Sequence, residues 1–260
     1  MTDSLHGHKA RKRFGQNFLE DDNVINNIVH AIAPQVGDNM VEIGPGLAAL
    51  TRFLLPACQK LHVIELDRDL AARLPNTLAG LGELHLHQAD ALNFDFAQLA
   101  SIEHPLRIVG NLPYNISTPL IFHLLSFSHI VKDMTFMLQK EVVDRLAGEP
   151  STADYGRLSV MVQYRCQVDW LLDVPPEAFN PPPKVQSAVV RLTPWQNSPY
   201  NCQNETLLQH IVSTAFNQRR KTLRNCLKGL AEDADFIAVE VRASRVRLSP
   251  LGLIAVAFTP

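Results

Sequence analysis

The stretch Ile108-Val109-Gly110-Asn111-Leu112-Pro113-Tyr114 joins an apolar run to a turn that carries an amide, a proline and an aromatic ring in succession. The apolar run is typical of a buried strand, and residues 118–127, which follow, have helical spacing. The stretch therefore predicts a strand–turn–helix unit. A turn with these three side chains suits holding a flat, amine-bearing ring by one edge and one face.

The same alternation of apolar runs and helical patterns continues on both sides of this stretch. Upstream, the run 40–43 breaks at Gly44, and the runs 61–66 and 84–89 are separated by helical segments. This order predicts βαβ units and a mostly parallel sheet, which is an α/β fold. The expected strands are 40–43, 61–66, 84–89, 106–109, 134–138, 168–174 and 187–192, and the expected helices are 24–34, 47–58, 68–78, 118–127, 141–147, 157–166, 205–216, 219–230, 235–241 and one from 250.

The composition is that of a globular protein with enough apolar material for a core, since 46% of the 260 residues are hydrophobic and 19% are charged. No apolar run reaches the roughly 18 residues of a membrane span, and the basic N-terminus lacks the apolar segment of a secretory signal. The four cysteines form no CxxC, so a reduced, cytoplasmic protein is expected. The polar, turn-rich segment 195–203 predicts one domain over 1–195 and a small helical domain over 196–260.

Charge is distributed unevenly along the chain. The net charge is −2, yet residues 184–228 hold 7 Lys and Arg against 1 Asp or Glu. A basic segment on an otherwise acidic protein predicts a polyanionic partner, although a solvated helix face explains the charge alone equally well. The residues expected to contact phosphate groups of such a partner are Lys9, Arg11, Lys12, Arg13, Lys184, Arg219, Arg220, Lys221 and Arg224.

Four polar or glycine residues lie where successive expected strands end: Gly44, Glu65, Asp90 and Asn111. In open α/β sheets, ligands bind outside the carboxyl ends of the strands. We therefore expect these four residues to line one crevice.

The segment 44–49 fits the pattern G-x-G-x-x-A between a strand and a helix, which lets the backbone approach a ligand closely. Glu65 follows about 20 residues later, where a carboxylate binds ribose hydroxyls. Together they predict a nucleoside cofactor, either NAD or S-adenosylmethionine. Glu42 favours S-adenosylmethionine, because an acidic residue is ill placed near a pyrophosphate but suits a cationic amino-acid end.

Asp90 and Phe179 each have two interpretations. Asp90 either accepts a hydrogen bond from an adenine amine or caps a turn, and we favour the first because it ends the third strand of the crevice. Phe179 lies within 175–183, a proline-rich segment expected to be irregular. It is either a loop anchor, which the sequence favours, or the second half of an aromatic sandwich around a flipped base.

The turn from Asn111 to Tyr114 discriminates best between functions. An exocyclic adenine amine is a poor nucleophile, because its lone pair is delocalised into the ring. Two acceptors, the Asn111 side-chain oxygen and the Leu112 carbonyl, favour a tetrahedral nitrogen with a localised lone pair. Pro113 fixes the turn without a competing N–H group, and Tyr114 can stack on the base. The alternative is a plain Asn-Pro turn with Tyr114 in the core.

Ordered motifs over nearly the whole chain resemble those of the small-subunit ribosomal RNA adenine dimethyltransferases, the KsgA/RsmA group. The resemblance implies a seven-stranded class I methyltransferase fold with a small helical C-terminal domain. It also implies that two adjacent adenosines near the 3′ end of small-subunit rRNA are each methylated twice, within an immature ribosomal subunit. The matching stretches are RKRFGQNFLEDDNVINNIV, VEIGPGLAALT, VIELDRDL, QADAL, VGNLPYNISTP, FMLQKEVVDRL, AFNPPPKVQSAVVRL and AFNQRRKTLRN.

The resemblance also implies roles for particular residues. Asn17 and Leu19 close over S-adenosylmethionine, Gly44 and its neighbours cradle the methionine end, Glu65 binds the ribose, and Asp90 binds the cofactor adenine. The segment 111–114 holds the target adenine, and Phe179 stacks on it. Ala48 departs from the pattern, because many relatives have glycine there.

Three alternatives stay open: an Erm-type methylase of large-subunit rRNA, a non-catalytic ribosome assembly factor, and a nicotinamide dehydrogenase. The dehydrogenase explains Gly44 to Glu65 but gives Asn111 to Tyr114 no role. The ten histidines form no HExxH or other ligand spacing, so no metal is expected. We expect a monomer that yields S-adenosylhomocysteine.

Overall fold

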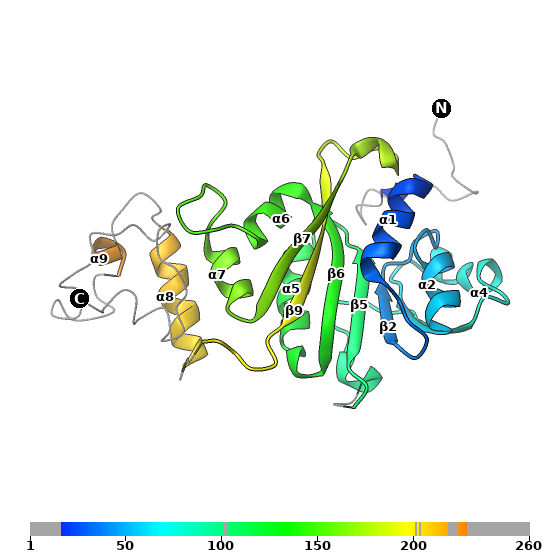
Figure 1. Ribbon diagram of the computed structural model, residues 1–260, viewed down its shortest axis with the longest axis horizontal. Coiled ribbons are helices and arrows are strands. Elements are labelled where there is room, and N and C mark those ends of the chain that lie inside the picture. The colour runs from blue at the N-terminus through cyan, green and yellow to red at the C-terminus, as the bar shows by residue number, and fades with distance from the viewer. Residues whose placement is uncertain (1–16, 101–102, 201, 203, 218–222, 228–260) are drawn as a thin grey trace. The chain divides into compact units, whose positions relative to one another are not determined.

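The computed structural model describes residues 17–100, 103–200, 202, 204–217 and 223–227 (Figure 1). The chain divides into two compact units. The first comprises Met1–Val143 and Asp169–Pro194, and the second comprises Asp144–Val168 and Trp195–Pro260. The expected boundary after residue 195 lies close to the start of the last segment, but the sequence did not predict that 144–168 groups with it.

A seven-stranded sheet forms the centre of the first unit, in the order β4-β3-β2-β5-β6-β9-β7. Strands β4, β3, β2, β5 and β6 run parallel, and β9 pairs antiparallel with β6. This confirms the α/β class and the seven strands. The strands are β2 Asn39–Ile43, β3 Lys60–Ile64, β4 Glu83–His87, β5 Leu106–Asn111, β6 Val131–Gln139, β7 Cys166–Val174 and β9 Ser187–Pro194.

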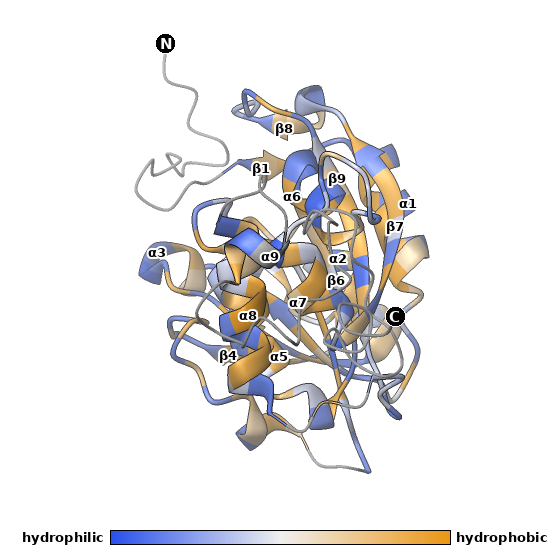
Figure 2. Cartoon of the chain, turned by 90° about the vertical axis from the view of Figure 1, so that its left-hand side faces the viewer, coloured by the Kyte–Doolittle hydropathy of each residue, from blue (hydrophilic) through white to orange (hydrophobic). Residues whose placement is uncertain are grey.

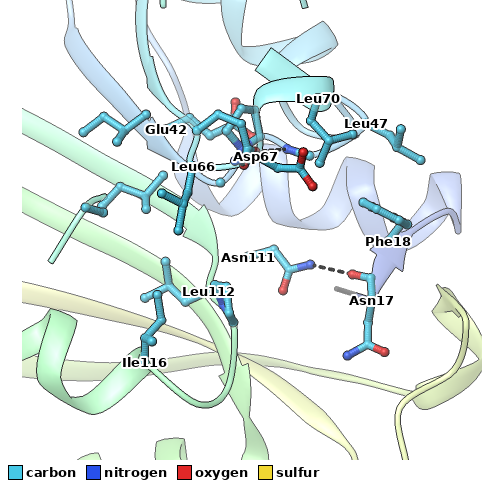
Figure 3. A pocket seen from close by; sticks show the side chains of 18 of the residues that line it. Asn17, Phe18, Glu42, Leu47, Leu66, Asp67, Leu70, Asn111, Leu112 and Ile116 are labelled. Atoms are coloured by element: carbon cyan, nitrogen blue, oxygen red, sulfur yellow. Dashed lines mark hydrogen bonds between the residues drawn. The ribbon is translucent and has the colours of Figure 1, made fainter. Parts of the chain in front are cut away.

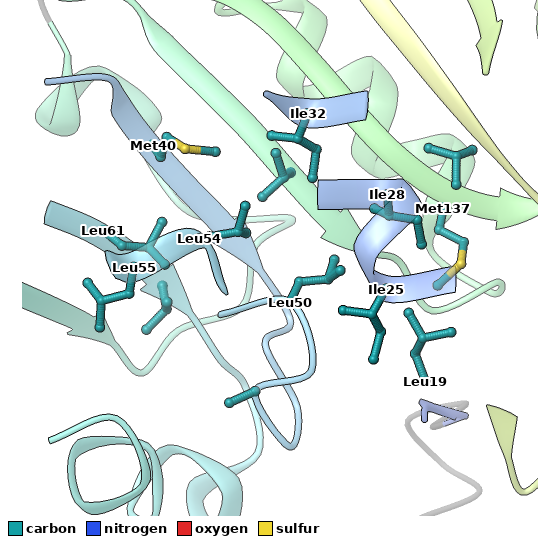
Figure 4. Close-up of a cluster of buried hydrophobic side chains, with 14 of the residues drawn as sticks. Leu19, Ile25, Ile28, Ile32, Met40, Leu50, Leu54, Leu55, Leu61 and Met137 are labelled. Atoms are coloured by element: carbon teal, nitrogen blue, oxygen red, sulfur yellow. The ribbon is translucent and has the colours of Figure 1, made fainter. Parts of the chain in front are cut away.

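Both faces of the central strands are buried, as expected for a parallel sheet covered by helices. On one face, α1 (Asp22–Ile32) and α2 (Thr51–Cys58) pack against side chains from β2, β3, β5 and β6 in a single cluster (Figure 4). The remaining helices of this part of the chain are α3 Arg68–Ala71, α4 Leu74–Thr77, α5 Ser117–Leu125 and α6 Lys140–Leu146. The buried cluster includes Leu19, Ile25, Ile28, Ile32, Met40, Leu54, Leu55, Leu61 and Met137.

The end of α1 is tied to the sheet by a buried arginine. Arg107 on β5 donates hydrogen bonds to the carbonyl oxygens of Ile32 and Ala33 and forms ion pairs with Asp38 and Asp133. These bonds satisfy carbonyl groups that have no partner within the helix. These contacts fix the end of α1 against the amino-terminal end of β5, whereas the candidate site lies at the carboxyl ends of the strands.

Two expected helices differ from the structure. The helix expected over 47–58 begins only at Thr51, because Gly46 and Ala48 both adopt positive φ angles (58° and 66°), which an α-helix excludes. The helix expected over 68–78 is split into α3 and α4, since Pro75 cannot donate the backbone hydrogen bond that would join them.

The proline-rich segment 175–183 is more regular than expected. It contains a short 3-10 helix, Pro176–Ala178, and a two-residue strand, β8 (Phe179–Asn180). A proline is tolerated in the first turn of a helix, where its missing N–H group would be unpaired anyway. Strand β8 pairs antiparallel with β1 (Phe18–Leu19), so it brings the start of the described chain beside residues 179–180.

Three described helices lie wholly in the second unit: α7 (Arg157–Gln163), α8 (Glu205–Asn217) and α9 (Leu223–Cys226). Helix α8 carries both hydrophobic and hydrophilic residues (Figure 2), and Leu208, Val212 and Ala215 are its buried positions. They join a second cluster with Tyr155, Val160, Met161 and Tyr164. The described residues include no helix with the length and hydropathy needed to span a bilayer.

Candidate active site

A cavity of about 350 Å³ lies at the carboxyl ends of β2, β3, β4 and β5 (Figure 3). Gly44, Glu65, Asp90 and Asn111 all line it, so the expectation that the four strand ends form one crevice is confirmed. A volume of this size is within the range of small-molecule sites. The parallel sheet explains the convergence, because the carboxyl ends of parallel strands meet at one edge.

The glycine loop after β2 is shaped for close approach of a ligand. Gly44 and Gly46 have φ angles of 67° and 58°, a region that disfavours residues with a side chain. A Cβ atom added to Gly44 would meet nothing closer than the Asn111 carbonyl oxygen at 4.0 Å, so this glycine faces free space. That space is the room a bound cofactor needs.

Glu65 links the glycine loop to the end of β3. Its Oε2 accepts a hydrogen bond of 3.2 Å from Gly46 N, and its Oε1 accepts one of 2.8 Å from Asp67 N. Burial raises the pKa of the Glu65 carboxyl, and these backbone donors oppose that effect. The carboxylate is thus held in place before any ligand arrives, as a preorganised site requires.

The described residues that line the cavity bring four carboxyl groups and no Lys, Arg or His. Glu42 is only 2% exposed, and its Oε2 has no hydrogen-bond partner among the described residues. Burial, together with the nearby Glu65 carboxylate, raises the pKa of Glu42 to about 7. The four carboxyl groups belong to Glu42, Glu65, Asp67 and Asp90.

This charge pattern decides between the two nucleoside cofactors that the glycine motif left open. A pyrophosphate would be repelled by the carboxylates, and the described lining residues offer no cation to offset that repulsion. A cofactor with cationic groups is attracted, and the unpaired Glu42 oxygen offers an acceptor for an ammonium group. The residues present therefore fit S-adenosylmethionine and not NAD.

Asp90 shows the turn cap that was the alternative to a binding role. Its Oδ1 accepts from Leu92 N at 3.0 Å, and its Oδ2 accepts from Asn93 Nδ2 at 2.9 Å. It nevertheless lines the cavity together with Ala89 and Ala91. Carboxylate oxygens have more than one acceptor position, so the cap and a contact with adenine are compatible.

The turn after β5 forms another part of the cavity wall. The Asn111 side-chain nitrogen donates a 3.2 Å hydrogen bond to the Asn17 carbonyl oxygen, which leaves Oδ1 without a partner among the described residues (Figure 3). Leu112 N donates to the Met137 carbonyl oxygen at 3.2 Å, and Pro113 lines the cavity. The side chain therefore presents an acceptor, as the sequence predicted for Asn111.

Tyr114 also lines the cavity, half-buried, and its hydroxyl lies 2.7 Å from Ser187 Oγ. Burial raises the pKa of the Tyr114 phenol, so the hydroxyl is un-ionised at neutral pH. Ser187 was not predicted as a site residue, because a single serine far along the sequence carries no pattern. Asp67 was missed as well, although its place two residues after Glu65 was a usable signal.

Asn17, Leu19 and Phe179 lie close together through the pairing of β1 with β8. Asn17 and Leu19 line the cavity, whereas Phe179 does not. Phe179 is 3% exposed, pairs with Leu19 and belongs to the buried cluster, which is the loop-anchor arrangement. Its stacking on a target base stays a prediction.

The residues expected to bind RNA are only partly described. Lys184 is exposed just before β9, and Arg224 lies in α9. The described residues contain no cluster of His, Cys, Asp or Glu suited to a metal ion. Lys9, Arg11, Lys12, Arg13, Arg219, Arg220 and Lys221 lie outside the described residues.

Comparison with known proteins agrees with the geometry of this site. A family model described as ribosomal RNA adenine dimethylase matches residues 7–246. The ribosomal RNA small subunit methyltransferase A of Saccharophagus degradans is 58% identical over 244 residues, which cover 94% of this chain and 91% of the relative. The protein of that name from Acinetobacter baylyi is 62% identical over 229 residues, covering 88% and 84%.

Two solved structures share the fold. A dimethyladenosine transferase from Plasmodium falciparum superimposes with a TM-score of 0.72 at 30% identity, over 81% of this chain and 74% of that one. The 23S rRNA methyltransferase ErmE superimposes with a TM-score of 0.73 at 23% identity, over 93% and 98%. At that identity the second likeness concerns the fold alone.

Proposed function

The chain belongs to the ribosomal RNA adenine dimethylase family, and we propose that it dimethylates two adjacent adenosines near the 3′ end of small-subunit rRNA. It is an S-adenosylmethionine-dependent methyltransferase that forms N6,N6-dimethyladenosine. The observation that carries the proposal is one cavity that combines four carboxyl groups with the free Oδ1 of Asn111. The first feature suits a cationic nucleoside cofactor, and the second suits an amine.

The cavity residues hold the cofactor in this proposal. Bound S-adenosylmethionine supplies a methyl group on an electrophilic sulfonium. The glycine loop at Gly44 cradles its amino-acid end, with Glu42 as the acceptor for the ammonium group. Glu65 receives the ribose hydroxyls, Asp90 receives the adenine, and Asn17 with Leu19 covers it from β1.

The turn residues prepare the nucleophile. Asn111 Oδ1 and the Leu112 carbonyl accept the two hydrogens of the adenine amine, which localises the nitrogen lone pair and aims it into the cavity. Pro113 has no N–H group to compete, and Tyr114 stacks on the base. Catalysis in this scheme is mainly positioning, which can contribute several kcal/mol when the reacting atoms are held near attack distance.

The substrate is an immature small ribosomal subunit in the cytoplasm, on which the protein acts as a monomer and assists subunit biogenesis. Basic residues outside the described part, together with Lys184 and Arg224, contact the RNA backbone. The names of the relatives, small subunit methyltransferase A, favour this substrate over the large subunit of an Erm-type enzyme.

The test is a methyl-transfer assay with unmethylated small subunits, parallel large subunits and labelled S-adenosylmethionine, followed by digestion to nucleosides. N6,N6-dimethyladenosine from small subunits alone is the expected result. Label in large-subunit RNA would favour the Erm-type alternative. Tight association with small subunits without label would favour an assembly factor. An increase in melting temperature with S-adenosylhomocysteine but not with NADH checks the cofactor independently.

A further inference from the structure

The hydrogen bond between the Tyr114 hydroxyl and Ser187 Oγ, 2.7 Å long, joins the turn after β5 to the first residue of β9. Tyr114 lines the cavity, whereas Ser187 is fully buried and does not. Two chain segments 73 residues apart thus meet through their hydroxyl groups beside the cavity. None of the assigned binding roles uses Ser187.

The sheet holds Ser187 firmly. Ser187 pairs with Gln139 at the end of β6, and just beyond this pair Lys140 N donates a 2.9 Å hydrogen bond to the Gln186 carbonyl oxygen. The backbone on both sides of this strand start is therefore fixed. A serine hydroxyl at such a place has a defined position and few rotamers, because its surroundings are close-packed.

The turn that carries Tyr114 rests on β6. Asn111 pairs with Met137 on that strand, and Leu112 N donates to the Met137 carbonyl oxygen. Because β6 lies between β5 and β9 in the sheet, the hydrogen bond from Tyr114 to Ser187 links the turn after β5 to a strand that is not its neighbour. Ser117 Oγ donates to the Tyr114 carbonyl oxygen at 3.2 Å, which holds the backbone of the turn but not the ring.

We propose that Ser187 is a positioning residue for methyl transfer, whose hydroxyl holds the Tyr114 ring in the plane that stacks on the target adenine. The proposal rests on the proposed function, in which Tyr114 contacts the base. A tyrosine side chain turns about two torsions, and the bond at its far end restrains both. The stacking face is then ready before the base arrives, which lowers the ordering cost of the reactive complex.

The alternative is that Ser187 only stabilises the fold, as many buried hydroxyl groups do. The two roles differ in what they predict for Tyr114. A purely stabilising hydrogen bond would lower the melting temperature when either hydroxyl is removed, but it would leave kcat unchanged under conditions in which the protein stays folded. A positioning Ser187 acts only through the Tyr114 hydroxyl, so removing either partner produces the same loss of kcat.

The experiment is a double-mutant cycle on the full chain with Ser187→Ala, Tyr114→Phe and the double variant. Thr135→Val is the matched control, because the Thr135 hydroxyl is also buried, on neighbouring β6, but has no hydrogen-bond partner in the described part of the chain. Steady-state kcat and KM for unmethylated ribosomal subunits, the Kd of S-adenosylhomocysteine by calorimetry and the melting temperature are measured for each.

We expect kcat of each single variant to fall roughly three- to tenfold. This factor corresponds to the net free energy that one hydrogen bond contributes. The double variant should lose no more than either single one, with cofactor Kd within about twofold of wild type. Ser187→Thr, which keeps the hydroxyl, should retain most of kcat. Thr135→Val should match wild type in every measurement.

Three results would overturn the proposal: an unchanged kcat in Ser187→Ala, losses that multiply in the double variant, or a loss of cofactor binding and melting temperature that accounts for the loss of kcat. The reference is the wild-type rate on whichever ribosomal subunit it methylates. Failure of the proposed substrate therefore appears in the wild type, while failure of the Ser187 role appears only in the variants.

Discussion

The side-chain nitrogen of Asn111 donates a 3.2 Å hydrogen bond to the main-chain carbonyl oxygen of Asn17, 94 residues earlier in the chain (Figure 3). The amide of an asparagine can face either way, and the carbonyl accepts only from the nitrogen. The bond therefore fixes which end of the Asn111 amide faces Asn17 and leaves Oδ1 as the acceptor on the cavity side. A residue before the first helix thus sets the orientation of a side chain on the cavity wall.

Replacement of Asn111 by alanine should lower kcat by roughly 100-fold, the scale reported for the loss of one preorganised polar group at a reaction centre. The Kd of S-adenosylhomocysteine should change little, because the other cavity residues remain. Methyl transfer to small subunits and calorimetry with S-adenosylhomocysteine measure the two effects. Asn115→Ala is the control, an exposed amide on the same cavity, and it should keep kcat within a few-fold of wild type. Equal losses in the two variants would contradict the role assigned to Asn111.

Cofactor affinity should fall as the pH drops below about 7. Burial raises the pKa of Glu42 to about 7 in the free protein, and a cationic ligand favours the ionised carboxylate. Below that pH the group must lose a proton before it can pair with the ammonium, so Kd rises by at most tenfold per pH unit. Calorimetry with S-adenosylhomocysteine at pH 6 and pH 8 should show this difference. In Glu42→Gln the affinity should be lower and should not change between these pH values. If the affinity of this variant still depends on pH, a group other than Glu42 causes the dependence.

Substitution of Gly110 by alanine should destabilise the fold by about 1–3 kcal/mol or more, the cost of overpacking a core. An added Cβ atom would lie 2.6 Å from the Ile43 carbonyl oxygen, where β2 and β5 run side by side, and 3.0 Å from Leu112 Cδ2. Urea unfolding measures the change in free energy of unfolding. Gly156→Ala is the control, since a Cβ atom there meets nothing closer than 4.0 Å. If the Gly110 variant is as stable as that control, β2 and β5 can move apart to accommodate the added Cβ atom without cost, and the prediction is wrong.

The fold should lose stability as the pH falls from about 6.5 to about 4, in part through His62. Its Nδ1 lies 3.0 Å from His87 Nε2, and its ring stacks on His85 and His87. Burial, together with the neighbouring His85 and His87, lowers the pKa of His62 to about 4. The unfolded chain therefore binds a proton in this range that the folded chain excludes, so unfolding is favoured as pH falls.

His62→Gln should flatten that part of the stability profile, measured by urea unfolding between pH 4 and pH 7.5. The control is His30→Gln, an exposed histidine on α1, which should leave the slope as in wild type. If both variants keep the wild-type slope, carboxyl groups and not the stacked histidines govern acid unfolding.

The strand ends of the site could be predicted from sequence because their convergence follows from one rule of sheet geometry. Once Gly44, Glu65, Asp90 and Asn111 were placed at the ends of parallel strands, their meeting in one cavity required no side-chain detail. The cofactor needed more, since the glycine motif occurs with NAD as well. The structure decided it through the carboxyl groups that gather on the cavity wall.

Other features depend on contacts that no local pattern records. Ser187 reaches Tyr114 only because β9 inserts beside β6 and runs antiparallel to it, an arrangement invisible in a short stretch of sequence. The late start of α2 follows from the positive φ of Ala48, a conformation that sequence analysis assigns to glycine. The burial of Phe179 depends on the pairing of β8 with β1, which joins segments about 160 residues apart, whereas its stacking on a base stays a prediction.

That pairing has a consequence for the synthesis of the protein. By the time Asn111 has left the ribosome, the four strand-end residues of the cavity have all been synthesised. The cavity wall formed by Asn17 and Leu19 still lacks its pairing partner, β8. Phe18 and Leu19 find their partners only when Phe179 and Asn180 emerge, and Glu20 N then donates to the Ala178 carbonyl oxygen at 2.8 Å. A nascent chain that stops short of this point lacks the support for Asn17 and Leu19 over the cavity. Tight cofactor binding therefore requires a chain that has been synthesised beyond residue 180. A cofactor present during translation would bind and stabilise such chains in preference to shorter ones.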